Sequence, residues 1–170
     1  KKYTPKNNSI SNSQVLFKDY SFEKARLLVK EMVELGSLRL VEKNLMTKTV
    51  SLYIGYSKNI INVTGGTEHT LNYTNSYTEL TKAFLRIYDK TTNRNMPIRR
   101  IGISFVNVIE EPGVQLNLFV DQEKLEKERK LESAIVEIKS KLGKNSVLRG
   151  MNLEEDANTI MRNKLIGGHN

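Results

Sequence analysis

Residues 97–105 form one predicted strand with two chemically different faces, and this feature limits the folds that are open to the chain. The two sets of side chains alternate, with Ile101, Ile103 and Phe105 on one side and Arg100, Gly102 and Ser104 on the other. Because successive side chains of a strand point to opposite faces of a sheet, other elements must cover the apolar set. The basic and hydroxyl-bearing set can stay bare. We therefore predict a sheet with helices on one face only.

Three further strands are predicted before this one. Residues 6–17 are polar at their start and apolar after Gln14, which indicates a strand, although a loop that caps the next helix is the alternative. Apolar and polar residues alternate over residues 47–57, as is typical of a half-buried strand. Residues 60–63 begin a partner strand, which the Gly65-Gly66 pair is expected to bulge or end.

Two amphipathic helices are predicted between these strands. The first follows Ser21 as its N-cap and either runs past Gly36 to Val41 or breaks at the glycine. The second follows a capping box formed by Ser76 and Glu79. Their apolar stripes consist of Phe22, Ala25, Val29, Met32 and Val33 in the first helix and of Leu80, Ala83, Phe84 and Ile87 in the second.

The order strand, helix, strand, strand, helix, strand predicts an α+β domain over residues 1–110. We expect a βαββαβ fold with a four-stranded mixed sheet and two helices on one face, followed by a helical C-terminal extension, residues 111–170. In this tail, residues 121–142 form a charged helix, and Asn152 caps a short helix that reaches about Lys164. The charged helix has a narrow apolar stripe that consists of Leu131, Ile135, Ile138 and Leu142.

The bare face of the sheet is expected to carry small polar side chains with one tyrosine and one arginine. The residues placed on it are Ser9, Ser11, Ser13, Thr49, Ser51, Tyr53, Arg100 and Ser104. Short side chains leave backbone N–H groups accessible, and such groups can donate hydrogen bonds to phosphate oxygens. This face is therefore predicted to lie against another molecule.

The excess of positive charge is confined to the first part of the chain. Residues 1–110 carry 17 Lys and Arg against 9 Asp and Glu, whereas residues 111–170 carry 10 of each kind. A domain with this bias attracts polyanions, nucleic acid first, because each neutralised phosphate releases condensed counterions. A surface kept soluble by lysine is the alternative, and net charge alone does not separate the two.

The pentapeptide QLNLF at residues 115–119 stands between an acidic Pro-Gly break and the charged helix. Leu118 and Phe119 could fill an apolar pocket of a partner, and the Gln115 amide can both donate and accept at the rim of that pocket. The alternative is an edge strand with Leu116 and Leu118 facing inward. Because no partner strand is apparent, we favour a docking peptide.

Three motifs together resemble the C-terminal part of a bacterial Y-family translesion DNA polymerase. They are Ser9-Ile10-Ser11 at the opening of a strand, PIRRIGIS at residues 97–104, and the QLNLF pentapeptide. KNSVLRG at residues 144–150 and the ending from Arg162 to His169 further resemble the UV-damage-repair branch of the family, which is similar to polymerase V catalytic subunits. The resemblance covers nearly the whole chain.

By this resemblance, residues 1–110 correspond to the little-finger domain, whose sheet lies on the phosphates of duplex or primer–template DNA. Arg99 and Arg100 match paired basic positions of the family, whereas Ser104 stands where relatives carry another basic residue. The residues expected to contact DNA are Ser9, Ser11, Ser13, Thr49, Ser51, Tyr53, Arg99, Arg100 and Ser104. The residues that match the family's motif for the bacterial sliding clamp are Gln115, Leu116, Leu118 and Phe119. The implied role is error-prone translesion synthesis in DNA repair and the SOS response to DNA damage.

The family's polymerase chemistry uses metal-binding carboxylates in a palm domain, and no counterpart is found in this sequence. Glu110, Glu111 and the acidic residues 154–156 are interpreted as solvated charge, and His69 and His169 have no partner at ligand spacing. We expect the fragment to be no enzyme and to bind no cofactor, with Mg²⁺ confined to the palm of a parent nucleotidyltransferase. The lack of cysteine, of a leader and of a long apolar run predicts a cytoplasmic, nucleoid-associated protein without membrane contact.

Two other functions stay open. A stand-alone RNA-binding or DNA-binding module of the same strand order would need aromatic residues on its central strands, and only Tyr53 comes near that pattern. A protein-interaction adaptor with a basic surface would use the narrow apolar stripe of residues 131–142 as its main partner surface.

Overall fold

A computed structural model of the protein describes residues 8–57, 62–111 and 121–165. Its elements are β1 (Ile10–Tyr20), α1 (Phe22–Glu42), β2 (Leu45–Tyr56), β3 (Val63–Thr74), α2 (Tyr77–Thr91), β4 (Ile98–Val106), β5 (Ile109–Glu110), α3 (Gln122–Leu142), the 3-10 helix η1 (Gly150–Leu153) and α4 (Thr159–Asn163). The predicted α+β class, the βαββαβ order and the helical extension are confirmed. None of the helices in the described residues is long and apolar enough to span a bilayer.

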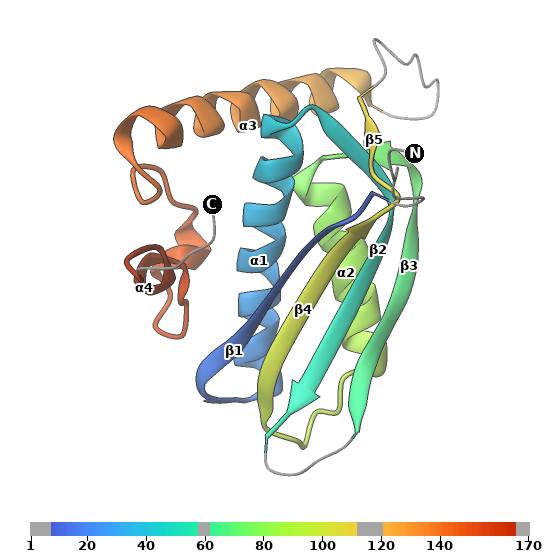
Figure 1. The fold of residues 1–170 in the computed structure, drawn as a ribbon, viewed down its shortest axis with the longest axis vertical. Helices are drawn as coiled ribbons and strands as arrows, with labels where there is room; N and C mark the ends of the chain where they lie inside the picture. The colour runs from blue at the N-terminus through green and yellow to red at the C-terminus, as the bar shows by residue number, and fades with distance from the viewer. Residues whose placement is uncertain (1–7, 58–61, 112–120, 166–170) are drawn as a thin grey trace, which may run out of the picture.

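The four long strands form one sheet in the order β1, β4, β2, β3, so that β1 and β3 lie at its edges (Figure 1). Every pair of neighbours is antiparallel, and the short β5 extends the pairing at the start of β2. This corrects the expectation of a mixed sheet. The crossover through α1 makes β2 run parallel to β1. β4 lies between these two strands, however, and is antiparallel to both.

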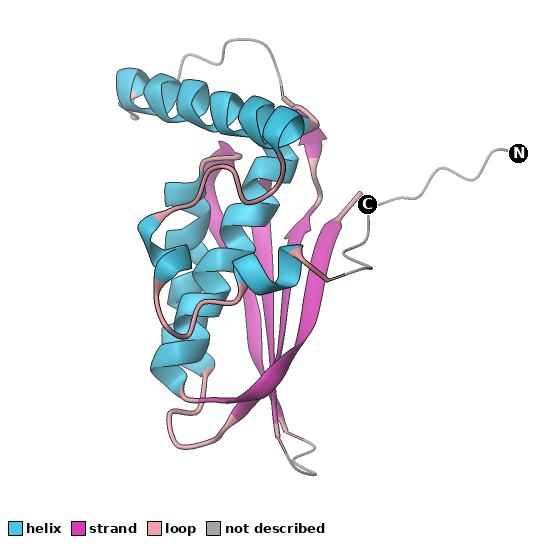
Figure 2. Ribbon diagram, turned by 90° about the vertical axis from the view of Figure 1, so that its left-hand side faces the viewer, coloured by secondary structure: helices cyan, strands magenta, loops and turns pink. Residues whose placement is uncertain are grey.

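α1 and α2 cover the same face of the sheet and leave the other face bare, as predicted (Figure 2). All apolar residues of the two predicted stripes are buried in the core between helices and sheet. α1 does not break at Gly36, and this glycine lies against the ring of Phe105. A Cβ added there would lie 2.3 Å from Phe105 Cε2, so the helix can approach the sheet only without a side chain at this position.

Both predicted helix starts are confirmed. The Oγ of Ser21 accepts the backbone N–H of Lys24 at 3.4 Å, and the Oγ of Ser76 accepts that of Glu79 at 3.2 Å. The second start is a simple N-cap and not the full capping box, because the Ser76 N–H donates to Thr74 Oγ1 at 3.0 Å.

β3 continues through Gly65 and Gly66, which corrects the expectation that these residues bulge or end the strand. Tyr53 pairs with Gly65 and Leu52 with Gly66 in unbroken register. Gly65 has a φ of +132°, and an added Cβ would lie 2.0 Å from the Leu52 carbonyl oxygen. Only glycine allows the strand to pass at this distance from β2.

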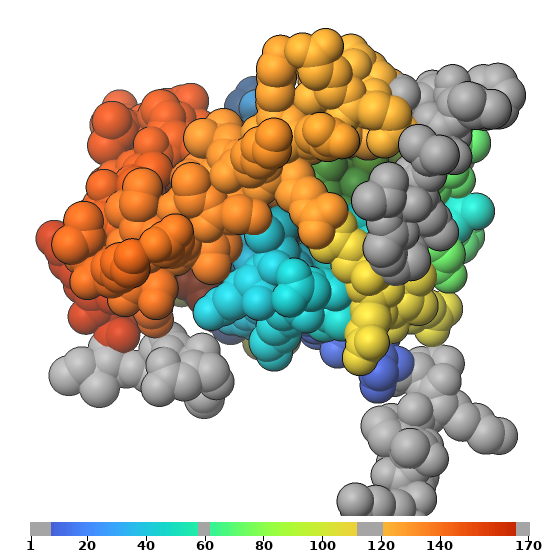
Figure 3. All heavy atoms as spheres, turned by 90° about the horizontal axis from the view of Figure 1, so that it is seen from above, coloured from blue at the N-terminus to red at the C-terminus, as the bar shows by residue number. Residues whose placement is uncertain are grey.

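The tail folds back on the first part of the chain. α3 crosses one end of α1, and the chain then runs beside α1 through η1 and α4 (Figures 1 and 3). The predicted short helix with Asn152 as its cap is wrong in detail: Asn152 lies inside η1, and α4 begins at Thr159. The Asn152 side chain accepts the Arg149 N–H at 2.9 Å and donates to Glu31 at 2.9 Å, so it links the tail to α1.

α3 does not pack through the apolar stripe predicted for it. Ile135 is buried, whereas Leu131, Ile138 and Leu142 are exposed. The buried neighbour of Ile135 is Glu132, a residue on an adjacent part of the helix surface. The packing face is therefore rotated relative to the apolar stripe.

Carboxylates hold α3 against the start of α2. Glu132 Oε1 accepts the backbone N–H of Tyr77 at 3.1 Å, and Glu128 accepts the N–H of Thr78 at 3.0 Å and the hydroxyl of Ser76 at 2.8 Å. The first N–H groups of a helix have no partner within that helix, and negative charge is favoured beside them. Two carboxylates of α3 thus satisfy donors of α2, which apolar spacing could not reveal.

Candidate nucleic-acid interface

The bare face of the sheet is organised in rows of cross-strand partners. In one row each of the four long strands contributes a hydroxyl group, from Ser11 in β1, Ser104 in β4, Ser51 in β2 and Thr67 in β3. The Oγ atoms of Ser11 and Ser104 lie 2.8 Å apart. Hydroxyl groups can both donate and accept, so this row offers uncharged hydrogen-bonding groups across the sheet.

The next row combines small residues with one aromatic ring. Its members are Ser13, Gly102, Tyr53 and Gly65. Tyr53 is exposed, and a Cβ added at Gly102 would lie in ordinary contact with it, 3.4 Å from the Tyr53 Cβ. The absent side chains leave a shallow cavity of about 260 Å³ beside the ring, with Ser13 and Ser51 among its lining residues.

Arg100 supplies positive charge to the third row, where it pairs with Val15 on one side and Gly55 on the other. Its side chain is exposed. Within residues 8–57, 62–111 and 121–165 it makes no ion pair or hydrogen bond. Its guanidinium group is therefore able to bind an anion laid on the sheet.

Arg99 does not share this environment, although the sequence pairs it with Arg100. It lies where the register of β4 shifts against both neighbours, and its Nη1 is 3.4 Å from Asp19 Oδ1. Both partners are partly exposed, and such pairs contribute only about 0–1 kcal/mol. The Arg99 cation is thus weakly held by Asp19 and can exchange this partner for a phosphate.

Two other predicted residues lie at one end of the face. Thr49 of β2 pairs with His69 of β3, and its Oγ1 lies 3.0 Å from the His69 Nδ1. Ser9 is exposed and lies just before β1, which covers Ile10–Tyr20, whereas the expected strand covers residues 6–17. In the described part of the chain, no group of three or more His, Cys, Asp or Glu side chains could hold a metal ion.

Residues 7–118 match the family model described as impB/mucB/samB family C-terminal domain. The chain belongs to this family. It is also 30% identical over 167 residues to "Putative UV-damage repair protein UvrX" of Bacillus subtilis (strain 168), in an alignment that covers 95% of this chain and 38% of that protein. The chain thus spans well under half the length of this relative. The predicted resemblance to the C-terminal part of a bacterial Y-family polymerase is confirmed.

Solved structures are also similar to this impB/mucB/samB family member. One of them is titled "Complex of beta-clamp processivity factor and little finger domain of PolIV", with a TM-score of 0.46, 12% identity, and coverage of 66% of this chain and 100% of that chain. The division of the chain at residue 110 stays a prediction. So do the roles of the predicted DNA-binding residues.

Sequence reasoning missed apolar side chains that this chain exposes on the bare face of its sheet. Val15 and Phe17 of β1 are 62% and 46% exposed, whereas Gln14 and Leu16, which alternate with them, are buried. The alternation was hidden because β1 has apolar residues on both faces. On the opposite edge strand, His69 also lies on this face, although the sequence offers it no metal-ligand partner. Its place on the face follows from the register of β3, which the sequence does not specify.

The predicted docking residues Gln115, Leu116, Leu118 and Phe119 lie outside the described residues. The described chain resumes at Asp121, whose side chain accepts the Lys124 N–H at 3.1 Å and caps α3. Glu111, before the gap, forms an ion pair with Arg129 of α3 at 2.6 Å. Glu111 and Asp121, the described residues on either side of the gap, are therefore both held at α3.

Proposed function

We propose that this chain is the DNA-binding, little-finger portion of an error-prone Y-family DNA polymerase that acts in translesion synthesis and DNA repair. The observation that supports this most is the bare sheet face, which carries a row of four hydroxyl groups in register and, two rows away, the unpaired side chain of Arg100. The family match supplies the polymerase context. The domain grips the backbone of duplex or primer–template DNA.

The chemistry of this face suits a grip that does not depend on sequence. Hydroxyl groups, backbone N–H groups and arginine are the usual ligands of phosphate and sugar, and such contacts position a protein without reading bases. The net charge of residues 1–110 adds a general attraction to the polyanion. A polymerase that holds DNA in this way tolerates distorted or damaged duplex.

The pentapeptide at residues 115–119 is proposed to tether the enzyme to the bacterial sliding clamp. Its glutamine and its terminal Leu118-Phe119 pair support this role. A tether raises the local concentration of the polymerase at the primer end without any new contact to DNA. The parent enzyme would carry its Mg²⁺ site in another domain and act in the cytoplasm, at the nucleoid.

The test of DNA binding is its dependence on salt. We expect the affinity of the full chain for duplex DNA, measured by fluorescence anisotropy, to fall with a log–log slope of about −3 to −6, as a handful of phosphate contacts requires. Several duplexes of unrelated sequence should give similar slopes. Affinity that does not change with salt contradicts a phosphate-binding face.

A protein-interaction adaptor is the second candidate, because Leu131, Ile138 and Leu142 are exposed on one side of α3. This apolar surface fits a protein partner better than it fits DNA. The salt titration separates the two functions. Weak binding to DNA that does not respond to salt favours the adaptor, and strongly salt-dependent binding favours the polymerase domain.

A further inference from the structure

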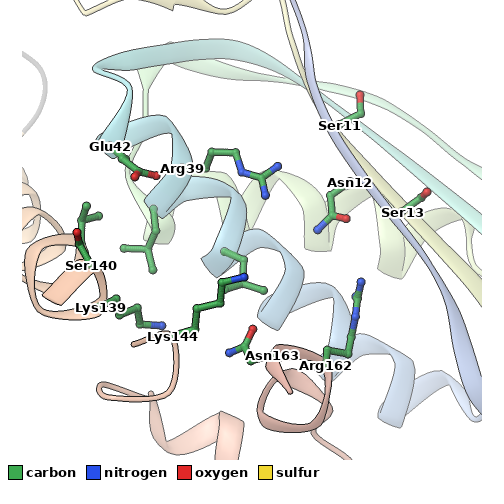
Figure 4. A pocket seen from close by; sticks show the side chains of 13 residues that line it. Ser11, Asn12, Ser13, Arg39, Glu42, Lys139, Ser140, Lys144, Arg162 and Asn163 are labelled. Carbon is green, nitrogen blue, oxygen red and sulfur yellow. The ribbon is translucent and has the colours of Figure 1, made fainter. Parts of the chain in front are cut away.

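A second cavity, of about 670 Å³, lies beside the bare face between the edge strand β1 and the C-terminal segment. β1, α1, α3 and the tail beyond α3 all contribute to its lining (Figure 4). Its basic residues are Arg39, Lys139, Lys144 and Arg162, and its one acidic residue is Glu42. Four positive charges against one negative charge make it a basic cavity, and such clefts concentrate the field and attract anions.

The cations converge from different elements. Arg39 extends from α1, Lys144 from the segment after α3 and Arg162 from α4, and all three point toward the space in front of Asn12 of β1 (Figure 4). Arg162 donates to Gln14 Oε1, which holds it at the cavity without neutralising its charge. The cavity therefore exists only because the tail folds back along α1.

Most of this charge has no counter-charge in contact with it. The side chains of Arg39, Lys139 and Lys144 make no ion pair or hydrogen bond with any residue that the structure describes. Burial lowers the pKa of Lys139 from its ordinary value, which reflects poor access of its ammonium group to water. Arg39 and Lys144 are exposed, whereas Lys139 is partly buried, so a bound anion would compensate Lys139 most for its lost hydration.

The basic cavity is continuous with the bare face. Ser11, Asn12 and Ser13 line both the basic cavity and the shallow cavity beside Tyr53, so β1 forms the rim between them. A ligand that leaves the sheet over β1 enters the basic cavity directly. The volume suits a short stretch of a single strand and excludes a duplex.

We propose that this basic cavity binds phosphate groups of a single-stranded nucleic-acid segment that continues from the bare sheet face over β1. The proposal rests on the proposed function, because nucleic acid on the sheet delivers the strand. Its continuity with the row of hydroxyl groups favours a nucleic-acid strand over an acidic peptide, since phosphate recognition then extends along one path.

The experiment measures the affinity of the full chain for two DNAs. One is a blunt duplex, and the other is the same duplex with a single-stranded overhang at either end. The test variant is Lys139→Gln with Lys144→Gln. The matched control is Lys124→Gln with Lys130→Gln, which removes the same charge from exposed positions of α3. At low salt we expect the test variant to lose about tenfold in affinity for the overhang DNA and less than about twofold for the blunt duplex. The control should bind both DNAs like the wild type.

The outcomes separate the two proposals. Wild type that binds both DNAs equally, or a test variant that loses both to the same extent, overturns the strand site and leaves the proposed function in place. Wild type that binds neither DNA overturns both.

Inorganic phosphate alone, followed by the amide NMR signals of Asn12 and Arg162, tests the source of the anion. Saturation by phosphate without preference for the overhang assigns the cavity to a free phosphate. Poly-glutamate binding that the test variant loses, with overhang binding intact, assigns it to an acidic peptide.

Discussion

Glu31 of α1 accepts a hydrogen bond from the backbone N–H of Asn158 at 2.9 Å, although 127 positions separate these residues in the sequence. Its other oxygen accepts the Asn152 side-chain amide at 2.9 Å and the Thr159 N–H at 3.3 Å. Glu31 is only 1% exposed. One buried carboxylate of α1 therefore fixes both η1 and the start of α4.

Glu31→Ala should release the tail, because the Asn152 side-chain amide and the backbone N–H groups of Asn158 and Thr159 all lose the carboxylate that accepts them. We expect the free energy of unfolding to fall by about 3 kcal/mol, since buried donors left without a partner keep their desolvation cost. Chemical denaturation measures the loss, and hydrogen exchange of the amides at residues 150–163 locates it. The control is Glu126→Ala, which removes an exposed carboxylate of α3 and should leave both readouts unchanged. Unaltered exchange in the tail of Glu31→Ala would contradict this role.

Glu132 should make the stability of the fold depend on pH. Burial raises the pKa of its carboxyl group to about 7 from the ordinary 4.5, and nearby Glu128 adds to the rise, whereas the Tyr77 N–H and Arg149 oppose it. The folded state thus holds this proton more tightly than the unfolded chain does. The stabilisation is complete below pH 4.5, falls as the pH rises to about 7, and changes no further above that, a loss of about 3 kcal/mol in total.

Glu132→Gln provides the comparison, because glutamine can still accept the Tyr77 N–H but cannot titrate. Other carboxyl groups contribute to both curves, so the quantity to measure is the difference in unfolding free energy between wild type and variant across pH 4.5 to 7. We expect this difference to shift steadily in favour of the variant as the pH rises. Parallel curves would show that Glu132 is not protonated in the folded protein.

The core of the first part of the chain could be predicted from sequence because its signals are local and redundant. The apolar stripe that begins at Phe22 and the alternation around Tyr53 each specify one element and one buried face. The strand order and the path through Gly65 could not be read in this way, because they depend on backbone pairing between segments far apart in the chain. Proximity to Phe105, not helix propensity, explains why glycine stands at position 36.

The site was predictable in part for the same reason. Period-two alternation placed Ser11, Ser51 and Ser104 on one face, but only the register aligns them in a row with Thr67. The tail was the least predictable region, since buried carboxylates such as Glu31 and Glu132 hold it. In a sequence these residues look like solvated charge, and only their partners show otherwise.

Gly65→Ala should destabilise the sheet strongly. The added Cβ would lie 2.0 Å from the Leu52 carbonyl oxygen, at a φ that side chains rarely adopt, so β2 and β3 must separate. We expect a loss of about 3 kcal/mol or more in unfolding free energy, measured by chemical denaturation. Gly102→Ala is the control in the same sheet, because its Cβ meets only ordinary contacts and should change stability by less than about 1 kcal/mol. Equal losses of unfolding free energy in the two variants would contradict the close approach of β3 to β2 at Gly65.

Arg100→Ala should weaken binding to duplex DNA to a similar degree for unrelated sequences, because a guanidinium group on phosphate carries no sequence information. The salt slope should become smaller in magnitude by about 1, as one lost phosphate contact requires. Arg99→Ala should have a smaller effect, since Asp19 competes for that side chain. Anisotropy titrations of both variants at several salt concentrations measure this. A loss confined to one DNA sequence would indicate that Arg100 reads bases.

Leu118→Ala combined with Phe119→Ala should abolish binding of the chain to the bacterial sliding clamp and leave its affinity for DNA unchanged. Truncating two large apolar side chains removes what is proposed to fill the pocket of the partner, whereas neither residue is among those proposed to contact DNA. Titration calorimetry with purified clamp measures the first effect and anisotropy the second. The matched control is Leu131→Ala with Leu142→Ala, which removes two exposed leucines from α3. If this control alone loses the clamp, the apolar stripe of α3 is the docking surface and the pentapeptide is not.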